Sequence, residues 1–253
     1  MDLGLAGRSA VVTGASRGLG RAIAEALAAE GAKVTLAARG GETLEQTATA
    51  LRASGATVHT VSADVTNAED CARLIEEAVA AHGGLDILVN NAGGGYAADD
   101  VVERFRISYE LNVVSALRLM ELAKPHLAAS GQGAVVNISS IFGRESGGVP
   151  QYNANKAAQI GMTKAYALDW IKQGIRVNSV APGSIAFEGG SWGRRLVEQP
   201  EAMAQFIEQN IAGGRFGRPE EIGEVVAFLC SPRASWIVGA TLNVDGGQSR
   251  SNI

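Results

Sequence analysis

The chain has few cysteines and no long apolar run. Its 253 residues include only two cysteines, Cys71 and Cys230, whose wide separation fits neither a metal-ligand spacing nor a disulfide framework. The longest apolar runs have the length of strands, which is too short for a membrane span. Residues 1–7 carry an acid and no apolar core, unlike a secretory signal. We therefore expect a cytoplasmic protein that binds no metal and no membrane.

Basic charge is also scarce. The formal net charge is −4, and no basic stripe is visible, whereas nucleic-acid binders normally carry one. We therefore expect no nucleic-acid partner. Hydrophobic residues make up 46% of the chain, which is ordinary for a globular protein with a substantial core.

Strand-like and helix-like segments alternate along the whole chain. Short apolar runs typical of buried parallel strands occur at 9–13, 34–38, 58–62, 87–90, 134–138, 176–180 and 241–244. Helical patterns occur at about 21–30, 42–53, 68–81, 102–122, 152–172 and 219–229, with Pro125 expected to mark the frayed end of the fourth. This alternation predicts one α/β domain over 1–253, a Rossmann-type doubly wound sheet of seven parallel strands with helices on both faces.

A glycine-rich loop joins the first strand to the first helix. Its sequence is Gly14-Ala15-Ser16-Arg17-Gly18-Leu19-Gly20. Glycines permit positive φ angles and let a diphosphate approach the backbone, while the helix N-terminus offers unpaired N–H groups to that anion. A glycine trio alone is a weak signal, but its place between a strand and a helix predicts a nucleotide site.

A second motif combines a serine, a tyrosine and a lysine. Tyr152 and Lys156 are four residues apart in a predicted helix, so their side chains share one face, and Ser140 ends the fifth predicted strand. A free tyrosine has a pKa of about 10, and a nearby cation lowers that value. Beside a nucleotide site, these groups predict proton transfer coupled to hydride transfer. Alone, the Tyr–Lys pair is more often a pair of neighbours on a solvated face.

The end of the second predicted strand bears on which nicotinamide cofactor is bound. Enzymes that take the cofactor without its 2′-phosphate usually carry an acid there, but Ala38 stands at this position. Arg39 follows it, and Arg17 lies in the glycine loop. Guanidinium groups bind phosphates well, so we predict NADP(H) in preference to NAD(H). The alternative is that both arginines are solvated loop residues.

Taken together, these motifs resemble those of the short-chain dehydrogenase/reductase family, and the resemblance extends from about residue 7 to 247. Its 3-oxoacyl-carrier-protein-reductase-like branch is the most similar. The motifs that carry the resemblance are 13–20, Asp64-Val65, Asn90-Asn91-Ala92-Gly93, Asn112-Val113, Asn137-Ile138-Ser139-Ser140, Tyr152-Asn153-Ala154-Asn155-Lys156 and Pro182-Gly183. The family implies a reductase or dehydrogenase that acts on a small carbonyl or alcohol substrate and forms a homotetramer or homodimer.

The resemblance also implies roles for individual residues. Ser140 would polarise the substrate oxygen, Tyr152 would act as general acid in reduction and general base in oxidation, Lys156 would lower the tyrosine pKa and bind the ribose, and Asn112 would hold a water. The residues together with the resemblance predict a cofactor site made of Gly14, Ser16, Arg17, Gly18, Leu19, Gly20, Arg39, Asp64, Val65, Asn91, Ala92, Gly93, Tyr152, Lys156, Pro182, Gly183 and Ile185.

Several of these residues also have structural interpretations. Ser139 competes with Ser140 for contact with the substrate. Asp64 is a candidate N-cap for the helix near residue 68, Asn91 is a candidate turn residue, and Asn112 is a candidate partner for a neighbouring strand.

One departure and one irregular segment bear on the substrate. Phe187 stands where the family usually has a threonine that contacts the nicotinamide amide. Residues 184–216 form the one irregular segment, which we interpret either as a mobile substrate lid or as a surface helix pair with its own aromatic core. We predict an NADPH-dependent carbonyl reductase. The alternatives are an NAD(P)+-dependent alcohol or sugar dehydrogenase and a catalytically silent nucleotide sensor.

Overall fold

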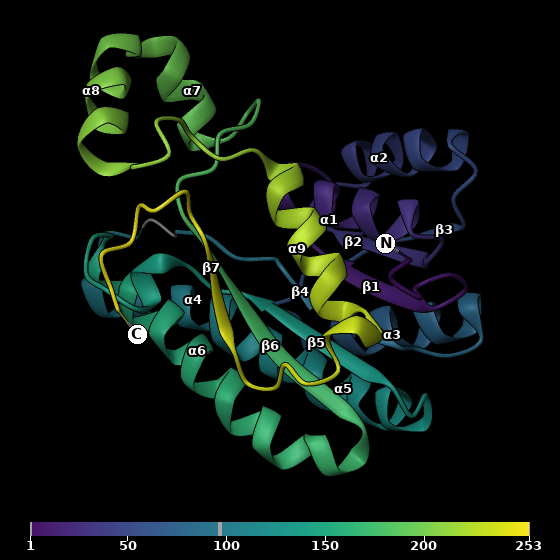
Figure 1. Cartoon of the computed structure of the whole chain (residues 1–253). Coiled ribbons are helices and arrows are strands. Elements are labelled where there is room, and N and C mark those ends of the chain that lie inside the picture. Colours follow the sequence, from purple (N-terminus) through teal and green to yellow (C-terminus); the bar gives the residue numbers. More distant parts are fainter. Residues whose placement is uncertain (1, 96–97, 253) are drawn as a thin grey trace.

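The computed structural model describes residues 2–95 and 98–252, and its centre is one parallel sheet (Figure 1). The strand order is β3-β2-β1-β4-β5-β6-β7, which confirms the seven-stranded sheet predicted from the sequence. The strands are β1 Ser9–Thr13, β2 Lys33–Ala38, β3 Val58–Ser62, β4 Ile87–Asn90, β5 Gly133–Ile138, β6 Ile175–Pro182 and β7 Thr241–Val244. The order reverses between β1 and β4, where sheets of this type leave a crevice at the carboxyl ends of the strands.

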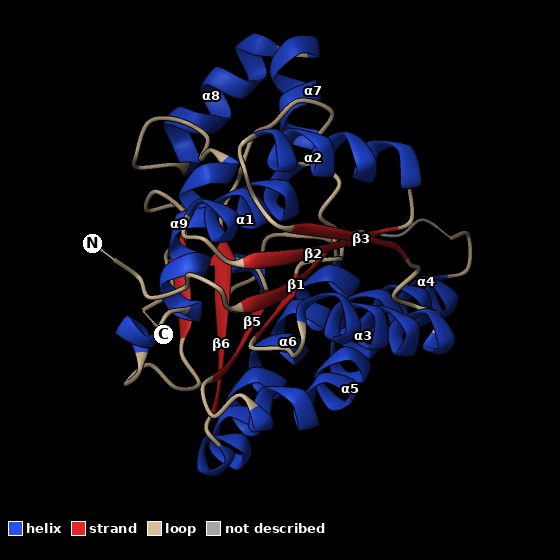
Figure 2. Ribbon diagram, turned by 90° about the vertical axis from the view of Figure 1, so that its right-hand side faces the viewer, coloured by secondary structure: helices blue, strands red, loops and turns tan. Residues whose placement is uncertain are grey.

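Helices cover both faces of this sheet, as Figure 2 shows. One face packs against α1 Gly18–Ala29, α2 Gly41–Ala53 and α9 Pro219–Cys230. The other packs against α3 Ala68–His82, α5 Ser115–Ala129 and α6 Pro150–Trp170. Strands β1, β5 and β6 are buried along their whole length because helices cover them on both sides.

The long helix expected over residues 102–122 is divided into three parts. The α-helix α4 Val101–Tyr109 runs into a π-helical segment, η1 Glu110–Val114, and then into α5. A π-helical segment contains one extra residue in a turn and often occurs at functional sites. The prediction that Pro125 marks the end of this helix is wrong. Pro125 lies inside α5, whose last turn stays helical with Leu127 buried in the core.

Residues 184–216 form a separate lobe above the carboxyl ends of the strands. It contains α7 Ser191–Glu198 and α8 Pro200–Asn210, drawn in green at the top of Figure 1. Its aromatic rings pack together, with the Trp192 ring centroid 4.9 Å from that of Phe206 and 5.1 Å from that of Phe216. The lobe therefore has the small aromatic core that the surface-helix interpretation expected.

The remaining helical turns are short 3₁₀ segments. They are η2 Ile141–Gly143, η3 Ile171–Gln173 and η4 Pro232–Ala234. Segment η2 matters for the site because it directly follows Ser140 and leads into the loop before α6.

Candidate functional site

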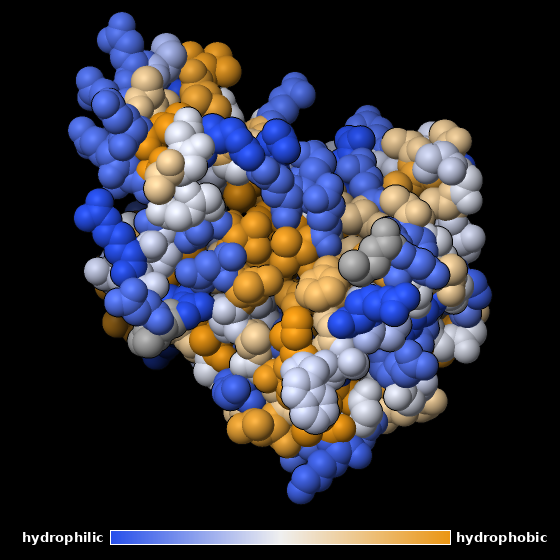
Figure 3. Space-filling view, viewed as in Figure 1, coloured by the Kyte–Doolittle hydropathy of each residue, from blue (hydrophilic) through white to orange (hydrophobic). Residues whose placement is uncertain are grey.

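A cavity of about 650 Å³ lies at the carboxyl ends of the strands, beneath the α7–α8 lobe. Figure 3 shows apolar residues gathered below this lobe, on the face formed by α9 and β7. The cavity is lined by most of the residues expected to bind the cofactor, namely Gly14, Ser16, Arg17, Leu19, Gly20, Arg39, Asp64, Val65, Asn91, Ala92, Gly93, Tyr152, Lys156, Pro182, Gly183 and Ile185. Ser140 lines it as well, whereas Gly18 and Asn112 do not.

The glycine loop owes its shape to close backbone contacts. Gly14 has a φ of +65°, and a Cβ atom on Gly20 would lie 2.2 Å from the Gly14 carbonyl oxygen. The side-chain amide of Asn91 donates hydrogen bonds to the carbonyl oxygens of Thr13 (2.8 Å) and Gly14 (3.3 Å). Asn91 therefore fixes the loop from β4. This glycine-lined backbone at the start of α1 fits a diphosphate, because the glycines themselves place no side chain between such an anion and the helix N-terminus.

Phe187 covers one part of this loop. Ring atoms of Phe187 lie 2.5 to 2.9 Å from the place that a Gly18 Cβ would take, so the ring rests directly on Gly18. This contact explains why Gly18 is absent from the cavity wall. The residue that replaces the usual threonine thus packs against the glycine loop.

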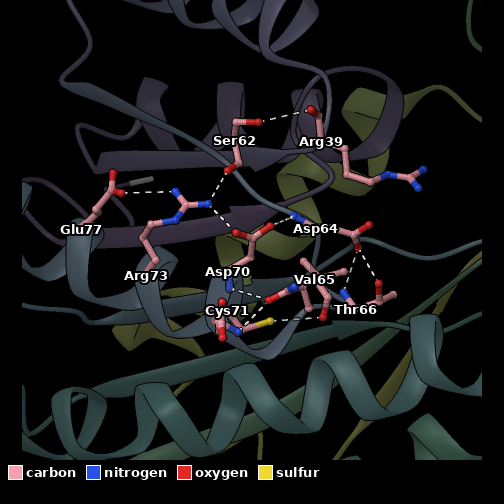
Figure 4. Close-up of polar contacts among 11 residues, drawn as sticks. Arg39, Ser62, Asp64, Val65, Thr66, Asp70, Cys71, Arg73 and Glu77 are labelled. Atoms are coloured by element: carbon pink, nitrogen blue, oxygen red, sulfur yellow. Dashed lines mark hydrogen bonds and ion pairs between the residues drawn. The ribbon is translucent and has the colours of Figure 1, made fainter.

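The end of the cavity at which we expect the adenosine is open and basic. Arg17 and Arg39 are both exposed, and Ala38 lies beside Arg39 at the end of β2. In Figure 4, the backbone carbonyl of Arg39 accepts a hydrogen bond from Ser62 Oγ (3.2 Å). Among residues 2–95 and 98–252, no hydrogen bond or ion pair involves its guanidinium. Arg39 therefore has a fixed backbone and a charged group that is free to meet an anion.

Asp64 and Val65 are held in place from the start of α3 (Figure 4). The backbone N–H of Asp64 donates to Asp70 Oδ2 (2.8 Å), and Cys71 Sγ donates to the Val65 carbonyl oxygen (3.2 Å). This backbone donor and Arg73 hold the pKa of Asp70 below its usual range. The Asp70 carboxylate and the Cys71 thiol thus fix the backbone of residues 64–65 at the cavity.

Asp64 is not the N-cap of α3. Asn67 caps the helix, because its Oδ1 accepts from the backbone N–H groups of Glu69 and Asp70. The Asp64 carboxylate instead accepts from the N–H (3.0 Å) and the hydroxyl (2.8 Å) of Thr66. The cap interpretation was therefore wrong.

At the other end of the cavity, Ser140 and Tyr152 lie together. Ser140 Oγ accepts a hydrogen bond from the N–H of Phe142 (3.2 Å) and also bonds the Tyr152 side chain. The Ser139 hydroxyl instead donates to the Val180 carbonyl oxygen (2.9 Å) and accepts from Ser179 Oγ (2.7 Å). Ser139 is thus engaged within the sheet, which favours Ser140 as the serine that contacts substrate.

Lys156 lies one helical turn after Tyr152 and is buried. Its Nζ lies 5.5 Å from the centroid of the Tyr152 ring and donates to the Ile138 carbonyl oxygen and to Gln159 Oε1, both at 2.8 Å. Burial lowers the pKa of Lys156 to about 7. At neutral pH this lysine is therefore close to its titration point.

The pKa of Tyr152 differs in direction from our expectation. We expected the lysine to lower it, but in the structure burial raises the pKa of Tyr152, opposed by the hydrogen bond with Ser140. The cause is the burial of the phenol, which disfavours its charged form, while the two hydrogen bonds of the Lys156 ammonium go to Ile138 and Gln159. The phenol is therefore protonated at neutral pH.

Asn112 lies behind the cavity wall, in the π-helical segment η1. Its amide nitrogen donates to the carbonyl oxygens of Gly94 (2.9 Å) and Ser108 (2.8 Å), and its Oδ1 accepts from the N–H of Gly94 (3.0 Å). A Cβ on Gly93 would lie 2.7 Å from Asn112 Oδ1 and 3.5 Å from Lys156 Nζ. Asn112 thus braces the 93–94 loop next to the lysine, and does not bond a neighbouring strand.

The sequence reasoning missed several residues of the cavity wall. Two of them, Gly40 and Thr43, follow Arg39 at the adenosine end, and the Gly40-Gly41 pair after the strand was a usable signal for a loop there. The others are Ala37, Ala63, Gly94, Leu111, Ile138 and Ser191. Of these, Ile138 lies within the motif at residues 137–140 and could have been found there.

The parallel sheet, with a glycine loop after its first strand and a cavity at its carboxyl edge, defines a Rossmann-type protein. A family model described as enoyl-(acyl carrier protein) reductase matches residues 14–249. A tropinone reductase homolog of Arabidopsis thaliana is 37% identical over 97% of this chain and 91% of its own. The chain therefore belongs to the short-chain dehydrogenase/reductase family of oxidoreductases.

Two solved structures are similar over nearly the whole chain. The structure of L-sorbose reductase from Gluconobacter frateurii, complexed with NADPH and L-sorbose, has a TM-score of 0.93 at 35% identity, and covers 99% of this chain and 100% of its own. A 3-oxoacyl-(acyl-carrier-protein) reductase from Agrobacterium tumefaciens with NADP bound has a TM-score of 0.91 at 33% identity, covering 97% and 96%. Among residues 2–95 and 98–252, no helix has the length and apolar character needed to cross a membrane.

Proposed function

We propose that the protein is an NADPH-dependent carbonyl reductase that reduces the ketone group of a small molecule. The observation that carries this proposal is that Ser140, Tyr152 and Lys156 line the same cavity as the glycine loop. A proton donor and a dinucleotide site within one cavity are what carbonyl reduction requires, because the carbonyl carbon takes a hydride while its oxygen takes a proton. The similar sorbose reductase, complexed with NADPH, supports this direction.

The residues of this chain divide the work between them. When bound, the cofactor supplies the hydride. Ser140 Oγ holds the substrate oxygen, and the Tyr152 hydroxyl donates the proton that converts the developing alkoxide to an alcohol. The raised pKa of Tyr152 keeps this proton in place until the oxygen becomes basic. The Lys156 ammonium then stabilises the phenolate that remains and bonds the ribose.

NADP(H) preference follows from the adenosine end of the cavity. Arg17 and Arg39 bring two exposed cations there, and Ala38 leaves no carboxylate to repel a phosphate. The NADP bound in the similar 3-oxoacyl reductase agrees with this preference.

The remaining expectations also belong to this proposal. One domain spans 1–253, and the 184–216 lobe acts as a substrate lid, supported by the fact that Phe187 and Trp192 from this lobe line the cavity. A homotetramer or homodimer is supported by exposed apolar side chains on α4 and α6, such as Val101, Val102 and Leu168. A cytoplasmic location is part of the same proposal.

The experiment is to mix purified protein with NADPH and a panel of β-ketoesters, diketones, ketoses and quinones, and to follow the loss of NADPH absorbance. We expect turnover of at least one carbonyl class. Turnover only of alcohols with NADP+ or NAD+ would indicate the dehydrogenase alternative. Tight binding of nucleotide with no turnover in either direction would indicate the sensor and defeat the proposal.

A further inference from the structure

The buried face of α6 carries polar side chains beyond the Tyr–Lys pair. Lys156, Gln159 and Thr163 lie along it and are 4%, 1% and 0% exposed. Such positions in a helix that packs on a sheet are normally apolar, because a buried polar group is costly unless it is hydrogen-bonded. Gln159 is bonded, since its Oε1 accepts from Lys156 Nζ at 2.8 Å.

The hydrogen bonds of the Lys156 ammonium can be accounted for one by one. An ammonium has three N–H donors. One goes to the Ile138 carbonyl oxygen of β5 and one to Gln159 Oε1, both at 2.8 Å. The third remains for the cavity, where Lys156 forms part of the wall. Two protein acceptors thus decide how the third N–H is aimed.

We propose that Gln159 is a positioning residue, which acts through Lys156 by holding the ammonium in its charged form and directing its remaining N–H into the cavity. This inference rests on the proposed function for its catalytic meaning. Its structural content, a side-chain acceptor that sustains a buried cation, applies to the protein without substrate or cofactor.

The groups around Lys156 explain why the Gln159 acceptor is important for the charge of the lysine. Tyr152 on α6 is the titratable group next to Nζ, and β5, η1 and the 93–94 loop present the Ile138 carbonyl, the neutral Asn112 amide and backbone. No carboxylate pairs with Lys156 among the described residues, and burial is the cause of its lowered pKa. Neutral acceptors therefore offset the cost of burying the charge, and Gln159 is the one that a substitution can remove.

The direct test is a titration of Lys156 in the ligand-free protein by NMR, with ¹³C at the lysine Cε positions and assignment by a Lys156→Arg variant. In wild type we expect a midpoint near 7. Gln159→Leu removes the acceptor at similar volume and is expected to lower the midpoint by about one pH unit or more. Gln159→Glu places a carboxylate against the ammonium and is expected to raise it by a similar amount.

The matched control is Thr163→Val. Thr163 lies one turn further along the same buried face and accepts a hydrogen bond from Asn137 Nδ2 (2.9 Å), but does not touch Lys156. It should lower thermal stability and leave the midpoint unchanged. Midpoints in the two Gln159 variants that match wild type, or that move in the same direction, would overturn the proposal. If Gln159→Leu does not fold, Gln159→Glu alone decides, because an unmoved midpoint there also overturns it.

The pH profile of reduction gives a second readout. Loss of the lysine proton should set the alkaline limb of kcat, so this limb moves to lower pH in Gln159→Leu and to higher pH in Gln159→Glu, with smaller changes in the KM for the ketone. Shifted NMR midpoints without any turnover would leave the inference standing and defeat the proposed function. Turnover with unshifted midpoints would do the reverse.

Discussion

The two ends of the cavity are built in opposite ways. At the catalytic end, Lys156 is 4% exposed and makes two hydrogen bonds of 2.8 Å, while Ser140 is 6% exposed and bonded to its neighbours. At the proposed adenosine end, Arg17 and Arg39 are exposed, and the Arg39 guanidinium makes no hydrogen bond or ion pair with the described residues. One end is fixed before any ligand arrives, and the other is left free.

The difference follows from what each end must do. Proton transfer needs atoms placed to within a fraction of an ångström, and that requires side chains held by packing and hydrogen bonds. Capture of a phosphate needs positive charge that reaches the anion from several directions, which a flexible exposed arginine supplies. Substitutions at the fixed end should therefore reduce the rate, and those at the free end should reduce affinity for one cofactor.

The sharpest test at the fixed end is Tyr152→Phe. It removes the proton donor and keeps the ring, so kcat for carbonyl reduction should fall by a factor of about 10² to 10⁴. NADPH affinity, measured by fluorescence titration, should stay near the wild-type value. A variant that still turns over at the wild-type rate would remove Tyr152 from the mechanism, and a variant that has lost NADPH binding would make it a structural residue.

Gly20→Ala tests the loop between the two ends. Its Cβ would lie 2.2 Å from the Gly14 carbonyl oxygen, a backbone atom that cannot move aside freely. We expect unfolding free energy to fall by about 1 to 3 kcal/mol, together with a large loss of NADPH affinity. The control is Gly161→Ala, a helical glycine with nothing within 4 Å of its Cβ position, which should be neutral or stabilising by about 0.5 to 1 kcal/mol. Equal melting temperatures for the two variants would contradict the close contact.

Ala38→Asp tests cofactor preference at the end of the cavity that carries the exposed arginines. A carboxylate beside Arg39 should repel the 2′-phosphate and pair with the guanidinium, so the Kd for NADPH should rise by about 10- to 100-fold. The Kd for NADH should stay the same or fall, because an acid at this strand end can bond the ribose diol. Arg106→Ala, an exposed substitution outside the cavity wall, serves as the charge control. If the Kd values for NADPH and NADH rise by the same factor in Ala38→Asp, the arginines do not recognise the 2′-phosphate.

These contrasts also mark what the sequence could predict. The strands, the glycine loop and the Ser–Tyr–Lys set follow from local patterns, because apolar runs and fixed spacings specify buried strands and one helix face. The π-helical segment at Asn112 leaves no such pattern, because it arises from how the chain between α4 and α5 packs. Pro125 misled us because tertiary packing of the following turn outweighs the cost of proline inside a helix.

The importance of particular side-chain contacts also could not be predicted from the sequence. The bond from Lys156 to Gln159 is local in position, but its importance depends on burial against β5, which a single sequence does not display. The contact between Phe187 and Gly18 joins residues far apart in the chain. The motif shows that Phe187 is unusual, but the sequence does not show that its ring covers Gly18.

Of these substitutions, Phe187→Thr is expected to have the smallest effect. It tests whether the Phe187 ring limits the approach of the cofactor to the glycine loop. The ring packs against Gly18 and Gly190, so it covers backbone that a diphosphate would approach. Removing it should lower the Kd for NADPH by less than about tenfold, a gain under 1.4 kcal/mol, because cofactor no longer has to displace the ring. Phe206→Leu, in the same lobe but packed on Trp192, is the control and should lower the melting temperature alone. Weaker NADPH binding in Phe187→Thr would instead mean that the ring supports the bound cofactor, and the free protein would then hold no barrier at Gly18.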